Sequence, residues 1–512
     1  MVPPLALAPL PVSVTVRPGA PFTVSASTPV TGEPAAVAEL RRLLGARLAA
    51  RVIGDGATSS GSVELAVGGE GAAESYTLEV SSGSVRITGA DAAGLFYGVQ
   101  TLAQLITTAD DGATIPAVRI HDAPRFAYRG VMLDVARHFF DVDTVIAYID
   151  RAASLKFNVL HLHLSDDQGW RLHIDARPRL TELASSTAVG GDAGGFYTHD
   201  DYARIVAHAT SKHMTVVPEI DMPGHTHAVS LAYPELAEQP VISDGLRSEA
   251  QERGEALPAH GAAYEGMSVG FSSLRIHDEG TYALLDDVLR DVAALTPGPY
   301  LHVGGDEALG TSAADYALFM ERVTAMVAAL GKTPLVWHEA GAAQGLHPDT
   351  IGQYWGFVEP VGDSAERTRT FATGGPKVIL SPADAVYLDM KFDASSPLGL
   401  TWARGVTSTR RAYEWEPAAV VPGVDEDDIL GVEAPLWTET ARDLDDLDAL
   451  AFPRIAAAAE AAWSPRTGTH PDRTWASFHP RVAGLAPLWH ALGIRFTPLT
   501  EIDETVREDL PS

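Results

Sequence analysis

The second part of this chain alternates short apolar runs with amphipathic helical windows, and this alternation limits the folds that it can adopt. Eight apolar runs occupy residues 130–135, 159–164, 215–220, 300–304, 334–338, 351–355, 377–380 and 429–437. Windows of helical periodicity lie between or after them, at residues 142–156, 200–212, 280–295, 313–330 and 439–462. Eight strand and helix units in this order are typical of a (β/α)8 barrel. The pattern therefore predicts an α/β protein with a TIM barrel over residues 124–512 that ends in a C-terminal helix.

Residues 1–123 form a different block, which we expect to be a small α/β domain preceding the barrel. A helix is predicted at 34–51, a hairpin at 75–87 that turns at Ser82 and Gly83, a second helix at 92–106, and a strand at 115–120. This block brings no pair of acids or histidines together in the sequence. A structural or interaction role is therefore expected for it.

Composition excludes several classes of function. The net charge of −30 disfavours nucleic acid and anionic membrane surfaces as partners. The absence of cysteine excludes disulfides, thiolate catalysis and zinc sites built on cysteine. No stretch approaches the roughly 20 apolar residues of a membrane span. A small-molecule or oligosaccharide substrate remains the expected partner, and the sequence does not predict an oligomeric state.

The first residues lack a basic leader, and their prolines interrupt the apolar stretch, so they do not resemble a signal peptide. We expect a cytoplasmic protein if the chain is full length, and a secreted one if a signal peptide has been removed.

Two adjacent acids, Asp306 and Glu307, follow the fourth apolar run of the barrel. The preceding Gly304 and Gly305 leave room for a ligand or another backbone to approach the acids. Barrel enzymes build their sites at the carboxyl ends of the strands, so this pair is expected at the mouth of the barrel. Two carboxyl groups in a concave site are also the minimum equipment for cleaving a glycosidic bond.

Polar and aromatic residues also lie at the ends of the other apolar runs or soon after them. They include Asp134 and Arg137 at the end of the first run, His161, His163 and Asp166 at the end of the second, Glu219, Asp221 and His225 at the end of the third, and Trp337, Trp355, Tyr387, Asp389, Trp402, Trp437 and Glu439 at or beyond the ends of later ones. Flat aromatic walls bind the apolar faces of sugars and enclose small methyl groups. Arg137 has two interpretations: an ion pair with Asp134, or a fork-shaped donor to two neighbouring hydroxyls.

Four motifs in order make a more specific resemblance. Four segments are similar to those of the exo-β-N-acetylhexosaminidases of glycoside hydrolase family 20. They are Leu-Asp-Val-Ala-Arg-His-Phe at 133–139, His-Leu-His-Leu-Ser-Asp-Asp-Gln-Gly-Trp-Arg at 161–171, Glu-Ile-Asp-Met-Pro-Gly-His at 219–225 and His-Val-Gly-Gly-Asp-Glu-Ala at 302–308. The resemblance extends from about residue 10 to the last helix. The architecture of that family, a small α/β domain before a (β/α)8 barrel, agrees with the division drawn above.

The resemblance implies hydrolysis of terminal β-linked N-acetylglucosamine or N-acetylgalactosamine, including sugars from chitin oligosaccharides, by a retaining mechanism without cofactor or metal. The 2-acetamido oxygen of the sugar is then the nucleophile and an oxazolinium ion the intermediate. Glu307 is implied as general acid and base, with Asp306 and Tyr387 orienting the acetamido group.

The same resemblance implies the substrate-binding residues. Three tryptophans, Trp337, Trp355 and Trp437, are expected to wall the acetamido methyl and the ring, with Trp402 nearer the leaving group. Other implied contacts are Arg137, Asp389 and Glu439 to ring hydroxyls, and Asp166 and His225 as a carboxylate and histidine connected to the general acid. A site that grips one terminal sugar implies exo action.

Two alternatives remain at this point. His161, His163, His225, His227 and Asp306 would suit a metal-dependent amidohydrolase-type barrel. That arrangement leaves the tryptophans and Glu307 without a role, and a chelator would distinguish it. The other alternative is a barrel that binds sugar without activity; loss of either acid would indicate it, and both are present.

The segment 228–272, between the third run and the next helix, is too long for a plain connection. We expect it to shape the rim of the site.

Overall fold

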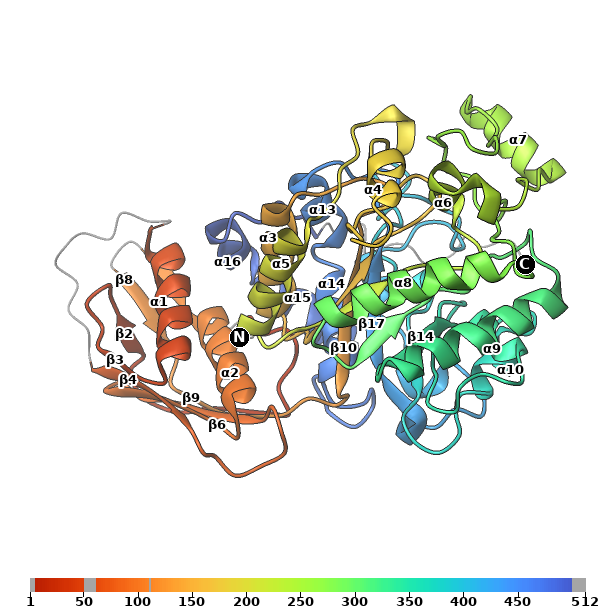
Figure 1. The fold of residues 1–512 in the computed structure, drawn as a ribbon. Helices are drawn as coiled ribbons and strands as arrows, with labels where there is room; N and C mark the ends of the chain where they lie inside the picture. The colour runs from red at the N-terminus through yellow and green to blue at the C-terminus, as the bar shows by residue number, and fades with distance from the viewer. Residues whose placement is uncertain (1–4, 50–60, 110–111, 500–512) are drawn as a thin grey trace.

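The structure, a computed structural model, describes residues 5–49, 61–109 and 112–499. Within these residues a closed barrel of eight parallel strands is joined to a smaller α/β domain (Figure 1). The predicted fold class is confirmed. None of the helices in the described ranges combines the length and the apolar character that a membrane span requires.

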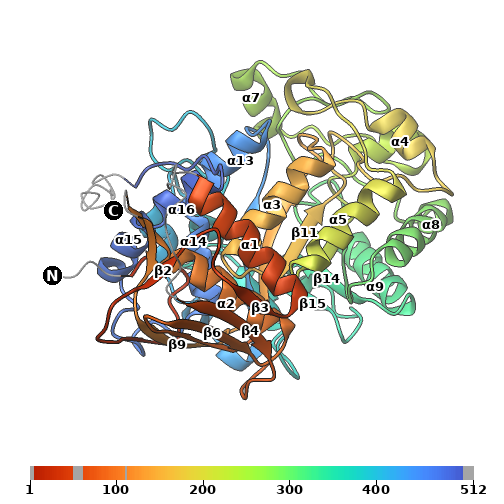
Figure 2. The ribbon, with the colours of Figure 1, turned by 90° about the vertical axis from the view of Figure 1, so that its left-hand side faces the viewer.

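The N-terminal domain is built on a six-stranded sheet with the strand order β1-β9-β5-β6-β4-β3. These strands are β1 (Ser13–Val16), β3 (Val30–Gly32), β4 (Ser62–Val67), β5 (Tyr76–Val80), β6 (Ser84–Gly89) and β9 (Val118–Asp122). Helices α1 (Pro34–Ala49) and α2 (Ala92–Leu105) cover one face of this sheet (Figure 1, Figure 2). A second, three-stranded sheet contains β2 (Phe22–Val24), β8 (Gly112–Ile115) and β7 (Thr107–Ala109). The predicted hairpin is confirmed, because β5 and β6 pair in antiparallel register.

The strand predicted at 115–120 is wrong as a single element. It is divided between β8 and β9, which belong to different sheets, and Pro116 and Ala117 separate them. Proline has no backbone N–H to donate to a ladder, so a continuous strand is interrupted there. The predicted helix at 34–51 ends at Ala49 in the described residues, and residue 51 lies outside them.

Buried ion pairs attach the small domain to the barrel. The Arg129 guanidinium lies 2.8 Å from the carboxylate of Glu74, and the Lys156 ammonium lies 2.7 Å from that of Asp122. The indole N–H of Trp463 donates to the same Asp122 carboxylate at 2.9 Å. Since an unpaired buried charge costs several kcal/mol, of order 3 to 5, these pairs hold the two domains in one relative position.

The barrel closes in chain order, from β10 around to β17, which pairs with β10 again. Its strands are β10 (Tyr128–Asp134), β11 (Val159–His163), β12 (Thr215–Glu219), β13 (Tyr300–His302), β14 (Thr333–Trp337), β15 (Ile351–Tyr354), β16 (Val378–Leu380) and β17 (Ile429–Leu436). All eight predicted apolar runs are thereby confirmed as strands. Nearly every residue of these strands is buried, as expected for parallel strands that are covered by helices on one face and closed on the other.

Helices surround the barrel. They are α3 (Val142–Ser154), α4 (Arg179–Ala184), α5 (His199–Ser211), α6 (His227–Ala232), α7 (Asp244–Arg253), α8 (Glu279–Leu295), α9 (Ala313–Ala329), α10 (Ser364–Arg369), α11 (Ala383–Val386), α12 (Thr409–Tyr413), α13 (Leu444–Ala451) and α14 (Ile455–Trp463), followed by α15 (Trp475–Ala483) and α16 (Ala486–Ala491). Short 3-10 helices are η1 (Val189–Gly191), η2 (Pro234–Leu236), η3 (His338–Ala342), η4 (Pro417–Ala419) and η5 (Glu426–Asp428).

One predicted helical window, 439–462, is two helices in the structure. Helix α13 ends before Phe452 and α14 begins at Ile455, with Pro453 between them. A proline inside a helix lacks the N–H for the backbone ladder and clashes with the preceding turn, so the helix ends before it.

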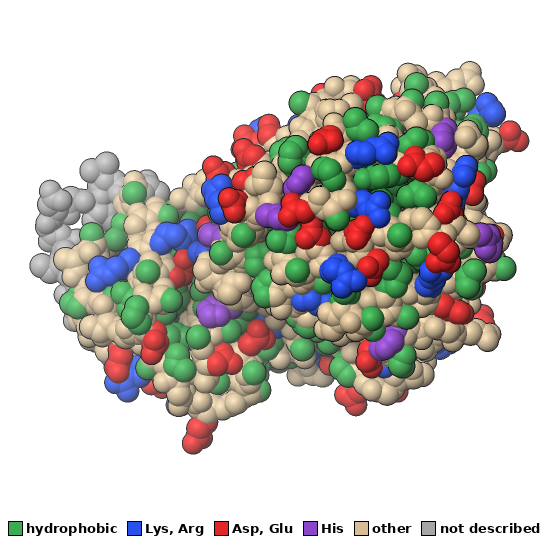
Figure 3. All heavy atoms as spheres, viewed as in Figure 1, with side chains coloured by type: hydrophobic (Ala, Val, Ile, Leu, Met, Phe, Trp, Pro, Cys, Tyr) green, Lys and Arg blue, Asp and Glu red, His purple; other side chains and the backbone are tan. Residues whose placement is uncertain are grey.

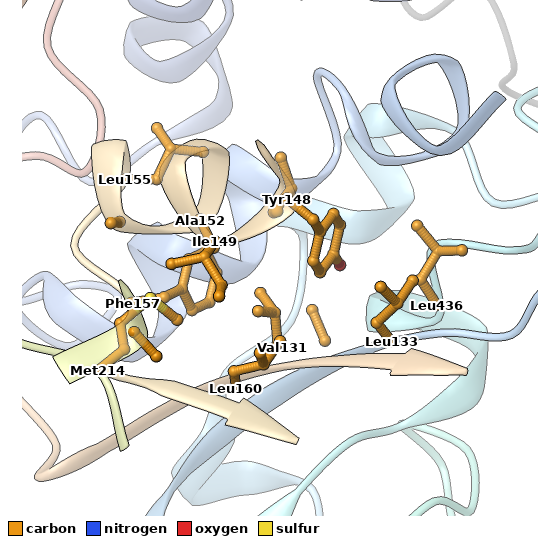
Figure 4. Packing of buried hydrophobic residues seen from close by; sticks show 14 of the residues in the cluster. Val131, Leu133, Tyr148, Ile149, Ala152, Leu155, Phe157, Leu160, Met214 and Leu436 are labelled. Atoms are coloured by element: carbon orange, nitrogen blue, oxygen red, sulfur yellow. The ribbon is translucent and has the colours of Figure 1, made fainter. Parts of the chain in front are cut away.

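The main core lies between the barrel strands and the surrounding helices. Figure 4 shows Tyr148, Ile149 and Ala152 of α3 packed on Val131 and Leu160 of the strands beneath it. The interior of the barrel has its own layers. An apolar layer that includes Tyr128, Val159, Val217, Leu335, Ile351 and Ile379 fills one end, and an aromatic layer that includes Met132, Trp337, Tyr387 and Trp437 lies toward the other. The surface shown in Figure 3 carries acidic side chains dispersed among basic and apolar ones over both domains.

Candidate active site

The turn after β13 requires its two glycines. At Gly304 the backbone φ is +64°, and a Cβ there would lie 1.6 Å from Oδ1 of the Asp221 carboxyl. At Gly305 φ is +106°, and its N–H donates to the same Asp221 oxygen at 3.2 Å. Only glycine fits these conditions. The turn places Asp306, which is 7% exposed, and then Glu307, whose side chain is 34% exposed, at the mouth of the barrel.

A cavity of about 270 Å³ opens at these acids. Nine of the twelve predicted site residues line it: Arg137, His225, Asp306, Glu307, Trp355, Tyr387, Trp402, Trp437 and Glu439. The other three, Asp166, Trp337 and Asp389, lie behind its wall and are at most 1% exposed. Residues from eight strand ends that are far apart in sequence thus meet around one space.

His225 connects the two acids to the barrel interior. Its Nε2 lies 3.4 Å from the Glu307 carboxylate and 3.6 Å from that of Asp306, and its Nδ1 lies 3.1 Å from Asp166. Burial opposes a charge on this ring, but the carboxylates of Asp166 and Asp306 raise the pKa of His225 well above its usual range. An imidazolium therefore lies between three carboxyl groups.

Asp166 supports this arrangement from behind the wall of the cavity. Its carboxylate lies 2.6 Å from the Arg137 guanidinium and 2.7 Å from His163. Despite burial, Arg137 and then His225 hold the pKa of Asp166 well below its usual range. A permanent negative charge here fixes both Arg137 and His225.

The ionisation of Asp306 is tuned by its surroundings. Burial, opposed by His225 and reinforced by the charges of Glu307 and Glu219, raises the pKa of Asp306 to about 6. Burial and the neighbouring Asp306 also raise the pKa of Asp221 well above its usual range, which favours the protonated form of Asp221. Asp306 is therefore mostly ionised at pH 7.

Aromatic rings form the wall of the cavity. The ring centroids of Trp337 and Trp437 are 6.2 Å apart, and those of Tyr387 and Trp437 are 6.3 Å apart. Trp402 lies 6.0 Å from Trp355 and is 46% exposed, so it stands at the opening. All four predicted tryptophans are thus brought together, and Trp337 is the most deeply buried of them.

The polar side chains of Arg137, Asp389 and Glu439 lie together at another part of the site. The Arg137 guanidinium lies 4.7 Å from the ring centroid of Trp437. Buried carboxyl oxygens of Asp389 and Glu439 have no hydrogen-bond partner among the described residues. Burial and the charge of Glu439 raise the pKa of Asp389 well above its usual range. These acceptors are suited to hydroxyl donors of a ligand, because a buried polar group without a partner is costly.

The 228–272 segment shapes the rim, as expected. Glu249 and Arg253 of α7, together with Met267 and Val269, line the cavity.

Sequence reasoning missed a polar layer inside the barrel. His161 lies 2.9 Å from Glu433 and 3.1 Å from Glu219, and His163 lies 2.5 Å from Glu219. Burial opposes their charges, but these carboxylates raise the pKa of His161 to about 10 and that of His163 to about 9. Trp337 also donates its indole N–H to Glu219 at 2.9 Å. The signal in the sequence was an acid within an apolar strand, because such an acid must have a buried partner.

The histidines proposed for a metal site do not form one set. His161 and His163 each lie between two carboxylates inside the barrel. His227 is hydrogen-bonded to the backbone oxygen of Ala262 at 2.8 Å. His225 lies with the two acids of the cavity.

Comparison with known proteins agrees with this geometry. The family model described as glycosyl hydrolase family 20, catalytic domain, matches residues 126–466, and that described as glycosyl hydrolase family 20, domain 2, matches residues 5–123. The chain is 40% identical to a β-N-acetylhexosaminidase of Cellulomonas fimi over 507 residues, which cover 96% of each protein.

Solved structures are also similar. A glycoside hydrolase family 20 β-N-acetylglucosaminidase is 58% identical, with a TM-score of 0.91 over 97% of this chain and 99% of the other. A mutant β-hexosaminidase of Streptomyces plicatus in complex with its product GlcNAc is 42% identical, with a TM-score of 0.84 over 97% and 98% of the two chains.

Proposed function

This chain belongs to glycoside hydrolase family 20, and from this premise we propose that it removes single terminal β-linked N-acetylglucosamine or N-acetylgalactosamine residues by a substrate-assisted mechanism with the residues described above. It is a glycoside hydrolase of the β-N-acetylhexosaminidase type, whose members cleave these terminal sugars. The observation that carries the proposal is the pair of adjacent acids in one aromatic-walled cavity, one buried and one partly exposed.

Glu307 is proposed as the general acid and base because its carboxyl is the more exposed of the two. In the first step the acetamido oxygen of the sugar bonds to the anomeric carbon, the bond to the glycosidic oxygen breaks, and Glu307 gives that oxygen its proton. In the second step water attacks the anomeric carbon, the oxazolinium ring opens, and Glu307 takes a proton from the water. The configuration at the anomeric carbon is retained.

Asp306 is proposed to accept the acetamido N–H and to stabilise the positive charge that develops on the oxazolinium ring. This requires an ionised carboxylate, which a pKa of about 6 provides at neutral pH. Tyr387, on the cavity wall, is proposed to donate its hydroxyl to the acetamido oxygen, because burial and nearby carboxylates raise its pKa and keep the phenol protonated. Groups already oriented toward the developing charge lower the barrier without reorganising.

The sugar ring is proposed to lie against Trp437, with Arg137, Asp389 and Glu439 bound to its hydroxyls. The unpartnered oxygens of Asp389 and Glu439 are acceptors suited to such hydroxyls. A cavity of about 270 Å³ suits one sugar, which favours exo action and release of monosaccharides.

The Streptomyces plicatus relative binds the monosaccharide GlcNAc, and we extend this ligand class to the present chain. Chitin oligosaccharides are proposed as one source of substrate, since a relative from Vibrio harveyi is an N,N'-diacetylchitobiase.

The first test compares p-nitrophenyl N-acetyl-β-glucosaminide with the plain β-glucoside, and adds a thiazoline analogue of the cyclised intermediate as inhibitor. We expect cleavage of the acetamido sugar only, with strong inhibition. Equal cleavage of both substrates would contradict the substrate-assisted mechanism.

Analysis of chitin oligosaccharide products tests exo action, because internal cleavage would release larger fragments first. Activity that survives a chelator would exclude the metal-dependent alternative.

A further inference from the structure

Glu339, which neither the sequence motifs nor the mechanism above uses, contacts a wall of the cavity. It lies in η3, directly after β14, and its side chain is 17% exposed. The indole N–H of Trp355 donates to both of its carboxyl oxygens, each at 2.9 Å. Trp355 itself lines the cavity. The side chain of Glu339 is thus the group that sets the orientation of this indole.

The other neighbour of Glu339 is a neutral histidine. The Nδ1 atom of His338 lies 3.3 Å from Oε2 of Glu339, and it forms no hydrogen bond within the described residues. Burial and the charge of Arg367 lower the pKa of His338 to about 3, so the ring is uncharged. In the tautomer with its proton on Nε2, this Nδ1 is an acceptor. The atom that would satisfy it is a proton on Oε2 of Glu339.

The charges around Glu339 favour that proton. Burial, and then the charges of Asp306 and Glu307, raise the pKa of Glu339 to about 8, although the Trp355 N–H acts in the opposite direction. The other titratable groups that face this region are Tyr316 of α9, Tyr387 after α11, and, beside His338, Arg367 of α10 and Asp363 directly before that helix. The two tyrosines are neutral, and the Arg367 and Asp363 side chains pair with each other at 2.7 Å. No described cation is paired with Glu339.

We propose that Glu339 is a positioning residue, which holds the Trp355 indole against the acetamido side of the cavity through its carboxyl oxygens and donates a proton from Oε2 to His338. In this state the carboxyl satisfies both neighbours and adds no third negative charge beside Asp306 and Glu307. A fixed indole determines how large an acyl group the cavity accepts. This inference rests on the proposed function for its effect on catalysis, but not for the hydrogen bonds themselves.

Two substitutions separate the hydrogen bonds from the titration. In Glu339→Leu the indole N–H and the His338 nitrogen both lose their partner. We expect kcat/KM for the N-acetyl substrate to fall about 10-fold, which is the size of effect that an unsatisfied buried donor produces. The ratio of kcat/KM for the N-acetyl substrate to that for an N-propionyl substrate should also decrease. In Glu339→Gln the amide oxygen accepts from Trp355 and the amide N–H donates to His338. This variant should recover most of the activity and selectivity that Glu339→Leu loses.

A double-mutant cycle tests whether Glu339 acts through Trp355. If it does, Glu339→Leu should change kcat/KM by less than about 2-fold in the Trp355→Phe background. A full additional loss there would overturn the proposal, as would a Glu339→Leu enzyme with wild-type selectivity or a Glu339→Gln enzyme as impaired as Glu339→Leu.

The proton on Glu339 has a readout that requires neither substrate nor activity. The tryptophan fluorescence of the wild type minus that of Trp355→Phe should change in a single step near pH 8, and Glu339→Gln should lack this step. A difference signal that is flat from pH 6 to 10 would overturn the shared proton. Failure of the proposed function is distinct, since it would appear as a wild-type enzyme inactive on the acetamido sugar. If Glu339→Leu does not fold, Glu339→Gln and the fluorescence titration still decide the proposal.

Discussion

The charge on His225 controls the pH range in which Asp306 is ionised, and replacing His225 with glutamine tests this directly. Glutamine retains a hydrogen-bond donor of similar size but carries no charge. In the native structure the imidazolium Nε2 lies 3.6 Å from the Asp306 carboxylate. Removing that charge leaves Asp306 beside Glu307 with no described cation in contact.

The size of the effect follows from this distance. At an effective dielectric constant of about 20, two unit charges 3.6 Å apart attract by roughly 4 to 5 kcal/mol. Water and side-chain rotation recover part of this in the variant, so we expect Asp306 to lose about 2.7 kcal/mol, or about 2 pKa units. Its pKa then rises from about 6 to about 8. The ionised fraction at pH 7 falls from roughly 90% to roughly 10%.

The assay is the pH profile of kcat/KM on p-nitrophenyl N-acetyl-β-glucosaminide. The acidic limb of His225→Gln should move to higher pH, with a loss of about 10-fold at pH 7 and a recovery toward pH 9. A mechanism that depends on ionised Asp306 requires this displacement of the limb, not only a lower rate.

His227→Gln is the matched control. The same substitution is made two residues along the chain, at a histidine whose ring contacts the backbone oxygen of Ala262 and not the two acids. Its acidic limb should stay in place. If His225→Gln lowers the rate equally at every pH, or if His227→Gln moves the limb as far, then His225 does not set the ionisation of Asp306.

Asp306→Asn should lower turnover by on the order of 10²-fold. Substrates with very good leaving groups need less acid assistance, so they should rescue Glu307→Gln more than Asp306→Asn. Equal rescue of the two variants in steady-state kinetics would contradict the assigned roles. Gly304→Ala should abolish activity and lower the thermal midpoint strongly, because its Cβ would lie 1.6 Å from a buried carboxyl oxygen. Gly362→Ala is the control, since Gly362 has a similar φ of +60° and a Cβ there would have no atom within 4 Å. It should lower the free energy of unfolding by only about 1 to 2 kcal/mol. Thermal stability should fall as pH rises from 6.5 to about 10, because the pKa of His161 is raised to about 10 in the folded protein. The charged ring contributes stability below its unfolded-state pKa, and this contribution is lost as pH rises through its folded-state pKa. A calorimetric midpoint that rises over this pH range would contradict that sign.

The alternation of apolar runs predicted the barrel because parallel strands are buried on both faces and leave a strong local pattern. All eight runs became strands. The errors occurred where a local pattern continued across a proline. Pro116 divides a predicted strand, and Pro453 divides a predicted helix. Both residues were visible in the sequence, so these boundaries were predictable in principle.

The candidate site was predicted as a set of residues, not as a set of contacts. Strand ends could be read from the sequence, and barrel geometry requires them to meet at one mouth. Which of them line the cavity depends on depth and side-chain direction, as for Asp166 and Asp389, which lie behind the wall.

The sequence by itself determined the order of the strands, the presence of two glycines before the two acids, and the residue types around the site. These depend on local periodicity, backbone φ and short motifs. Only the tertiary structure decided which charges face one another: that His225 lies among three carboxyl groups, and that Glu339 receives the indole N–H of Trp355. The physical reason is that ionisation in a buried site depends on distances of 3 to 4 Å between groups on different strands, and closure of the barrel alone establishes those distances.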